Sequence, residues 1–279
     1  MIWLGLMAAL TLATMGLWYV AWGGSQTTGS LKWLQFMQTI GTFTLPAIFG
    51  AWIWSESHKP FAWLRLTTRT AWQHYVLAFA IMIVALPGIN LLADLNSRVV
   101  LPECLSSLEQ WLRQQEETAA ALTERFLQAD NVGTLLVNVG LMALLPAFAE
   151  ELSFRGTLQQ IISNSQFKIH NSQIHVAIWI TAFVFSAIHM QFYGFVPRML
   201  MGAMFGYIFV WTGCLWVPIL MHFTNNGLAV FAYYFTSDSE QLKNYADTFG
   251  AGTTWWVGVI SLVITCLGLL IFYRRTHTR

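Results

Sequence analysis

Charge is what this 279-residue sequence has least of. Only 10% of its residues are Asp, Glu, Lys or Arg, whereas ordinary soluble domains carry about 25%. Hydrophobic residues make up 56%, with 14 tryptophans and 20 phenylalanines among the aromatic ones. A soluble domain of this size cannot hide so much apolar surface, so the composition indicates that lipid is the solvent.

Several familiar signatures are also missing. The three cysteines, Cys104, Cys214 and Cys266, are far apart and form no CxxC pair, so they suggest neither a disulfide framework nor a thiolate metal site. The net charge is +1 and no basic stripe is present, so no nucleic acid is expected as a partner. The sequence also lacks a GxSxG nucleophile elbow and an HExxH zinc motif.

What the sequence has in abundance is apolar runs. Most approach the ~20 residues that cross ~30 Å of hydrocarbon as a helix, although the fifth and sixth are short. None alternates as a barrel strand would, and Trp or Tyr stands at many run ends. We predict an all-α, polytopic bundle of about eight spans in one integral membrane domain, residues 1–279. The runs are Ile2–Trp22, Trp33–Trp54, Tyr75–Ala93, Val132–Phe148, Val176–His189, Pro197–Trp211, Trp216–Tyr234 and Trp255–Tyr273.

Basic residues predict the orientation of the bundle. An even number of spans places both termini on one side of the membrane. Arg274 and Arg275 follow the last run. The loop after the second run carries Lys59, Arg65 and Arg69, and it falls on the same side under eight spans. The positive-inside rule therefore predicts that both termini are cytoplasmic.

One long polar segment, residues 94–131, interrupts the apolar runs. Leu105, Leu108, Trp111 and Leu112 recur in it at helical spacing, which predicts an extramembrane amphipathic helix. Such a helix could lie on the membrane or over the bundle. A solvated linker helix is equally compatible with the pattern.

The stretch "EELSFR" places charge inside an apolar region. A charged residue in a span costs at least ~2.5–3.5 kcal/mol, so it needs a partner or a function. If the fourth helix continues past Phe148, then Glu150, Glu151 and Arg155 lie within the bilayer. Glu151 and Arg155 are four residues apart and can pair, whereas Glu150 points about 100° away. Two carboxylates in separate environments can divide structural and acid–base duties; the plainer reading is a charge cluster at the headgroups.

Two further polar pairs lie in later spans. Phe185 and His189 are four residues apart in the fifth run. His222 and Asn226 are four apart in the seventh, with Asn225 on another face. Such groups can join helices by hydrogen bonding, or they can be donors directed at one oxygen atom.

Taken in order, these motifs resemble a known family. "EELSFR" from Glu150, "FSAIH" from Phe185 and "HFTNN" from His222 are similar to the EExxxR, FxxxH and HxxxN/D motifs of the CPBP family. These are the CAAX prenyl proteases and bacteriocin-processing enzymes, also called the abortive-infection family. Each motif alone is weak, but three in order on a polytopic chain are specific. The resemblance covers residues 146–230.

The resemblance implies an intramembrane endopeptidase of the glutamic type, which cuts a membrane-associated protein or peptide precursor. By similarity, Glu150 is the general base that activates water, and His189 helps to hold that water. His222 and Asn226 would form the oxyanion hole, within catalytic core helices at residues 132–234. Three residues would support the site: Glu151, Arg155 and Phe185.

The cofactor and the depth of the site need separate arguments. Amide hydrolysis needs a base near water and preorganised donors, so we favour a metal-free site without a cofactor. Zinc held by Glu150, His189 and His222, with an open position for water, stays an alternative. At 1.5 Å per residue the three lie roughly 18, 20 and 10 Å from the cytoplasmic side. They can meet in a water-filled cavity only if the seventh span begins deeper or tilts.

Two other functions stay open. A non-proteolytic membrane scaffold or immunity factor could keep this fold and act by binding a partner, although no motif residue is lost. A proton-coupled transporter could use intramembrane Glu and His as a relay, although we find no internal repeat of the transporter kind.

Overall fold

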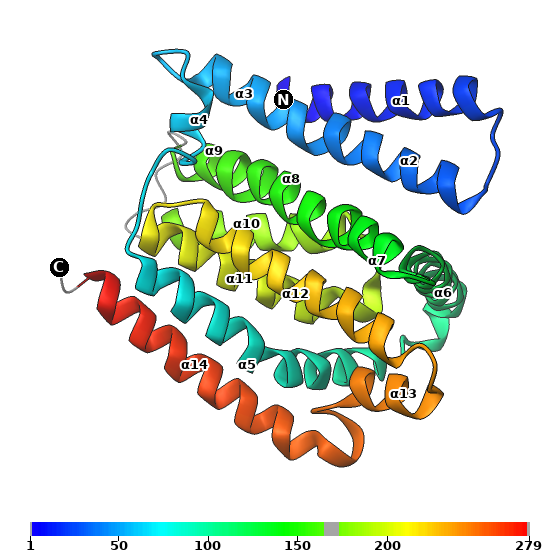
Figure 1. Ribbon diagram of the computed structural model, residues 1–279. Helices are drawn as coiled ribbons and strands as arrows, with labels where there is room; N and C mark the ends of the chain where they lie inside the picture. Colours follow the sequence, from blue (N-terminus) through cyan, green and yellow to red (C-terminus); the bar gives the residue numbers. More distant parts are fainter. Residues whose placement is uncertain (1, 165–172, 278–279) are drawn as a thin grey trace.

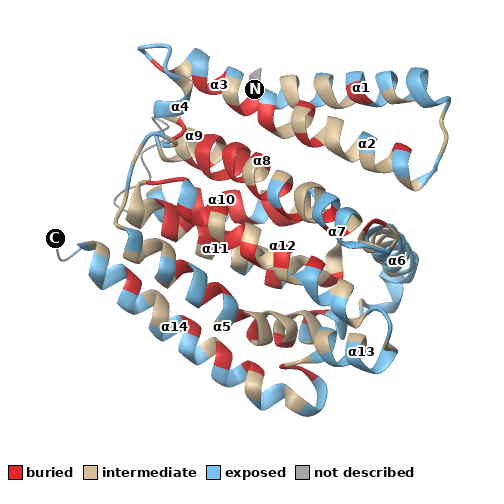
Figure 2. Ribbon diagram, in the orientation of Figure 1, coloured by how far each residue is buried: buried red, intermediate tan, exposed pale blue. Residues whose placement is uncertain are grey.

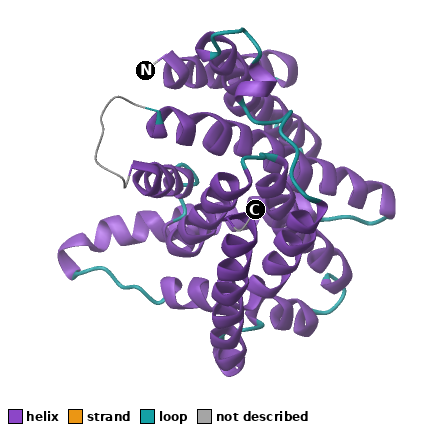
Figure 3. Ribbon diagram, turned by 90° about the vertical axis from the view of Figure 1, so that its left-hand side faces the viewer, coloured by secondary structure: helices purple, strands orange, loops and turns teal. Residues whose placement is uncertain are grey.

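The computed structural model describes residues 2–164 and 173–277, and within them every regular element is a helix. Figure 3 shows these helices joined by loops, so the predicted all-α class is confirmed. Three π-helical segments interrupt the long helices: η1 (Thr39–Thr44), η3 (Val139–Leu144) and η4 (Phe154–Gln159). The α-helices are α1 (Ile2–Trp22), α2 (Thr28–Gln38), α3 (Leu45–Trp54), α4 (Pro60–Trp63), α5 (Trp72–Ser97), α6 (Ser106–Leu127), α7 (Val132–Asn138), α8 (Leu145–Ser153), α9 (Gln160–Ser163), α10 (Gln173–Ala187), α11 (Phe195–Thr212), α12 (Trp216–Thr236), α13 (Glu240–Thr248) and α14 (Trp255–His277).

Helices occupy all eight predicted runs. The two that fall short of a membrane span by length or apolarity are α10, with only 15 residues, and α12, which carries several polar side chains. The C-terminal end of α14 lies at one end of the bundle, and α6 and α13 lie at the other (Figure 1). Six stretches are long and apolar enough to cross a membrane: Trp3–Trp22, Thr28–Trp54, Trp72–Ser97, Val132–Ser163, Phe192–Thr212 and Gly252–His277.

Burial follows the layers of the bundle. Buried residues concentrate in α8, α10, α11 and α12, whereas much of α1 and α14 is exposed (Figure 2). The exposed side chains on these outer helices are apolar, such as Leu12, Val20 and Leu267. Exposed apolar faces on this scale need lipid rather than water around them, and the polar groups of interest lie in the buried layer.

Proline sets the geometry of the fourth span, which runs from Val132 to Ser163 and so continues past the predicted end of its apolar run at Phe148. Pro146 has no N–H, so one α-helical hydrogen bond is lost. The residue before it, Leu145, donates instead to Gly140 O, five residues back, and this closes η3. Segment η1 precedes Pro46 in the same way. Segments of this kind occur often at functional sites, and here η3 and η4 flank the helix that carries both glutamates.

The fifth helix is shorter than predicted. Because α10 ends at Ala187, the prediction of a span through His189 was wrong at its end. His189 lies in the turn that follows, where its N–H donates to Ser186 O at 3.3 Å. Met190 takes a left-handed φ of 53° there. The chain thus turns at this point and leads through the short helix Phe192–Gly194 into α11.

The seventh helix begins inside the protein, which resolves the difficulty over depth. Cys214 and Leu215, just before α12, are fully buried. The segment after α4 covers them, with Leu215 N–H donating to Arg65 O at 3.3 Å and Cys214 Sγ to Thr68 O at 3.0 Å. His222, two turns into α12, therefore reaches the depth of the glutamates.

The polar segment forms α6, which lies across the end of the bundle (Figure 1). Phe126 anchors it in the core, and Arg125 donates to Gln26 O at 2.6 Å, next to the start of α2. Leu108 and Trp111 stay exposed. The structure therefore favours a helix over the bundle rather than a solvated linker.

Candidate active site

A cavity of about 490 Å³ lies among α2, α5, α6, α8, α11 and α12. Thr123 and Leu127 of α6 belong to its lining, so the cavity lies toward the end of the bundle that α6 covers. The structure brings every predicted catalytic residue to this one cavity: Glu150, His189, His222 and Asn226.

Glu151 and Arg155 form the predicted ion pair. Their side chains are fully buried, and Arg155 Nη1 lies 2.7 Å from Glu151 Oε1. Arg155 Nη2 donates to Gly202 O at 2.9 Å, and the guanidinium stacks 4.6 Å from the centre of the Phe185 ring. A buried pair with such additional bonds ties α8 and η4 to α11.

His222 is held by Glu151. Its Nδ1 lies 2.9 Å from Glu151 Oε1, and its ring stacks on Phe205 with centres 5.6 Å apart. Because a carboxylate only accepts, Nδ1 carries the hydrogen. The other nitrogen, Nε2, lies 3.9 Å from Glu150 Oε2, too far for a direct hydrogen bond but close enough for one small group to bridge.

The two glutamates therefore have different surroundings. Glu151 is closed off between Arg155 and His222. Glu150 lines the cavity, its side chain is 14% exposed, and among the described residues it has an ion-pair partner only in His222. This arrangement leaves one carboxylate structural and the other available for reaction.

Phe185 explains the second motif. His189 Nδ1 lies 2.7 Å from Phe185 O, and the two rings meet edge to face at 5.1 Å. Since a carbonyl only accepts, Nδ1 is the donor, and Nε2 of His189 is left as the available ring nitrogen. The same phenyl ring contacts Arg155 and His222, so one side chain aligns residues from three elements.

Sequence reasoning placed Asn225 on a different face from Asn226, yet both side chains line the cavity. Asn225 Nδ2 donates to Asn226 Oδ1 at 3.1 Å. This bond fixes the Asn226 amide and leaves its own Nδ2 as a donor. The third motif therefore supplies more polar groups than the two residues that define it.

The sequence reasoning also missed Gln35 and Arg198, which line the same cavity. Arg198 Nη2 donates to Gln191 Oε1 at 2.7 Å, while Arg198 Nη1 and Gln35 Oε1 are buried and have no hydrogen-bond partner in the described part of the chain. An arginine within the sixth apolar run was a signal that could have been used. Gln35 has no comparable signal, because a neutral amide in a span is common.

The fit of a metal can be judged from the side chains. Among the described residues, no three His, Cys, Asp or Glu side chains gather as a metal-binding group. His222 uses Nδ1 on Glu151 and His189 uses Nδ1 on Phe185 O. In a zinc site made by Glu150, His189 and His222, the Nε2 atoms of the two histidines and the Glu150 carboxylate would have to move closer together than they are here.

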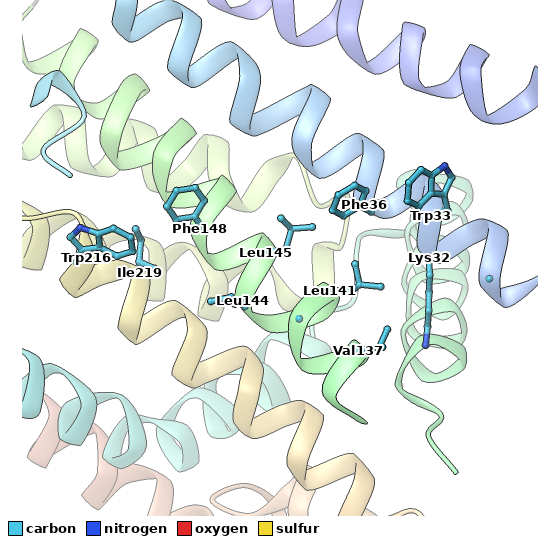
Figure 4. A pocket seen from close by; sticks show the side chains of 12 residues that line it. Lys32, Trp33, Phe36, Val137, Leu141, Leu144, Leu145, Phe148, Trp216 and Ile219 are labelled. Carbon is cyan, nitrogen blue, oxygen red and sulfur yellow. The ribbon is translucent and has the colours of Figure 1, made fainter. Parts of the chain in front are cut away.

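A larger, apolar groove of about 930 Å³ lies on the other side of the fourth span (Figure 4). Leu141 and Leu145 face it, with Trp216 of α12 at one end and Lys32 near the other. Lys32 Nζ donates to Asn138 Oδ1 at 2.6 Å. The α2 helix borders both hollows, since Gln35 lines the polar cavity and its neighbour Phe36 lines the groove.

The comparisons with known proteins agree with this geometry. Residues 132–228 match the Rce1-like family model, described as type II CAAX prenyl endopeptidase. The chain is 33% identical over 95 residues to the uncharacterized protein YpbD of Bacillus subtilis (strain 168), a match that covers 33% of this chain and 42% of YpbD. No solved structure matches the chain. The helical core at residues 132–228 is therefore similar to the Rce1-like type II CAAX prenyl endopeptidases, and the several long apolar helices indicate an integral, multi-pass membrane protein.

Proposed function

We propose that this chain is an intramembrane endopeptidase that hydrolyses a peptide bond in a membrane-associated protein or peptide precursor. The observation that carries the proposal is the contrast between the two glutamates. Glu151 is bound to Arg155 and His222, while Glu150 faces a polar cavity beside two histidines. One reactive carboxylate with fixed neighbours is what a general base requires.

In the proposed reaction Glu150 takes a proton from water as the water oxygen bonds to the carbonyl carbon. The carbonyl electron pair moves onto oxygen and forms the tetrahedral oxyanion. When the oxyanion collapses, the carbon–nitrogen bond breaks and Glu150 returns the proton to the leaving nitrogen. His189 Nε2 accepts a hydrogen bond from the attacking water and so directs its lone pair at the carbon.

The oxyanion needs donors that are in place before reaction. Asn226 Nδ2 supplies one, with its amide fixed by Asn225. His222 supplies the other from Nε2 when its ring carries both protons, since Nδ1–H is directed at Glu151. Glu151 and Arg155 act through His222 and are positioning residues.

Purified protein in liposomes, given a pool of synthetic peptides, tests the proposal. Glu150→Gln should lower cleavage by about 10²–10⁴-fold, the usual contribution of a general base. The two side chains are nearly the same size, so the unfolding temperature should change little. Glu124→Gln, on the exposed surface of α6, is the matched control. Cleavage by Glu150→Gln at the wild-type rate would rule out its role as base.

Metal removal separates the two mechanisms. A metal-free reaction should keep its rate after dialysis against EDTA and 1,10-phenanthroline. The rate is read from peptide cleavage by the same reconstituted protein. Loss of cleavage that added Zn²⁺ restores would instead favour a zinc site at Glu150, His189 and His222.

A further inference from the structure

Two partly buried polar side chains outside the three motifs line the cavity, and they come from two different helices. Gln35 belongs to α2, outside the region that matches the family, and Arg198 belongs to α11. Gln35 Oε1 and Arg198 Nη1 are both buried, and neither has a hydrogen-bond partner within residues 2–164 and 173–277. A buried polar group left unpaired costs about 1–3 kcal/mol, so both atoms gain a partner if a ligand in the cavity draws the two side chains toward it.

Arg198 is held in place for such a role. Its Nη2 donates to Gln191 Oε1, and its guanidinium lies over Gly194, where an added Cβ would come within 3.1 Å of Nη2. Among the described residues no carboxylate forms an ion pair with it. Glu116 and Glu150 act on the Arg198 charge only through space, and guanidinium donors suit carbonyl and carboxylate oxygens.

Gln35 complements Arg198 chemically. Its free Oε1 is an acceptor, and Arg198 Nη1 is a donor. A peptide in an extended conformation presents both an N–H and a C=O at every residue. A lipid chain offers neither group, and it fits the apolar groove behind Phe36 better than this cavity.

We propose that Gln35 and Arg198 form a peptide-binding subsite beside the scissile bond. Gln35 accepts a backbone N–H of the substrate, and Arg198 donates to a substrate oxygen, which is either a backbone carbonyl or a C-terminal carboxylate. The inference rests on the proposed function, because it names how the substrate of that cavity is held. Both are positioning residues and take no part in proton transfer.

Binding to a form that cannot cleave tests the subsite separately from catalysis. The probe is a pool of random nonapeptides, prepared as free acids and as C-terminal amides, with affinities measured on Glu150→Gln protein. Adding Arg198→Gln should weaken binding about 10–100-fold, the range for a hydrogen bond to a charged group. Adding Gln35→Leu should weaken it about 2–10-fold, as for a neutral hydrogen bond. Gln38→Leu, on the same helix but outside the cavity, is the control.

Comparison of the free acids with the C-terminal amides identifies which substrate oxygen Arg198 binds. If Arg198 binds a carboxylate, the free acids bind more tightly and Arg198→Gln removes that preference. If it binds a carbonyl, Arg198→Gln weakens both forms alike. In protein that keeps Glu150, the same substitutions should raise KM and leave kcat within about threefold. The reason is that the lost contacts bind the substrate equally in the ground state and in the transition state.

The outcomes of the two experiments are distinct. The subsite is overturned if Arg198→Gln and Gln35→Leu change peptide affinity no more than Gln38→Leu does. This outcome holds whether or not the wild type cleaves peptides. Absence of binding to every form also overturns the subsite. Binding that depends on both residues, without any cleavage by the wild type, supports the subsite and rejects the peptidase.

Discussion

At the scale of single residues, adjacent positions in a helix have different surroundings. Glu150 and Glu151 point about 100° apart. Glu151 therefore enters the core, where Arg155 and His222 bind it, and Glu150 enters the cavity. The phenyl ring of Phe185 lies against both Arg155 and His222, so the positions of the reactive groups depend on a few buried side chains.

The buried ion pair gives a prediction about stability. Arg155→Met should destabilise the protein by about 3–5 kcal/mol, because it leaves the Glu151 charge buried with only a histidine beside it. The double variant Glu151→Gln/Arg155→Met should recover part of that loss. Thermal unfolding in detergent, compared for the three forms, measures both effects.

An exposed pair supplies the control. Lys243 and Glu124 lie within 2.5 Å of each other at the surface, where water screens the interaction. Lys243→Met should therefore hardly move the unfolding temperature. If Lys243→Met and Arg155→Met lowered the unfolding temperature equally, burial of the Glu151–Arg155 pair would add no stability beyond that of an exposed pair.

The sequence was informative at this scale wherever spacing carried the signal. The i,i+4 relation predicted the Glu151–Arg155 pair, and the structure contains it. Residue spacing within one helix does not predict which side chains of another helix contact it. The contact between His222 and Glu151 and the approach of Gln35 and Arg198 to the cavity depend on helix packing, which periodicity does not encode.

At the scale of elements, close packing places α11 against the fourth and fifth spans. Gly202 and Gly206 form the contact. A Cβ at Gly206 would lie 2.8 Å from Gln159 Oε1 and 2.9 Å from Ile178 Cγ2. Small residues let the backbones approach in this way, and the approach brings Gly202 O to Arg155.

Gly206→Leu should destabilise the bundle by about 1–3 kcal/mol, the usual effect of overpacking. It should also lower cleavage, because α11 carries Arg198 and contacts Arg155. Gly16→Leu in α1 is the matched control, since a Cβ there meets nothing within 4 Å. The unfolding temperatures of the two variants provide the comparison, and equal values would contradict the packing argument.

The start of α6 should respond to acid. Glu109 bonds Arg113 and accepts the Leu101 N–H at 2.9 Å, and these bonds hold the pKa of Glu109 below its ordinary value of about 4.3. A lowered pKa means that the stabilisation is present above that value and is lost as the pH falls through the folded pKa. Glu109→Gln should therefore speed amide exchange around Leu101 at pH 7.

The control for this prediction is the same comparison in acid. As the pH falls through the folded pKa of Glu109, the exchange difference between wild type and Glu109→Gln should shrink, because the wild-type carboxylate becomes protonated. A difference that stays constant over the whole acid titration would mean that charge on Glu109 has no part in holding α6.

Element types were predictable from hydrophobic runs, but their ends were not. The run around α10 continues to His189, although the helix stops at Ala187 and the chain turns. The π segments η1 and η3 do not show in a hydrophobic period of 3.6. They arise where Pro46 and Pro146 each remove one α-helical hydrogen bond. These departures lie next to the candidate site and help to shape it.

At the scale of the whole molecule, the even number of passes fixes which loops share a side. Cys104 precedes α6 and is exposed. If both termini are cytoplasmic, a membrane-impermeant maleimide should label Cys104 in intact cells. Cys214 is buried and Cys266 lies in the apolar helix α14, so neither should compete. Cys104→Ser is the control, and labelling only after permeabilisation would reverse the predicted orientation.

The most direct test of the central claim compares peptide termini in membranes from cells that carry wild-type protein and cells that carry Glu150→Gln at matched levels. The proposed peptidase predicts new termini that appear only with the wild type. Identical termini in the two samples, with both proteins well expressed, would contradict it and favour a scaffold that acts by binding.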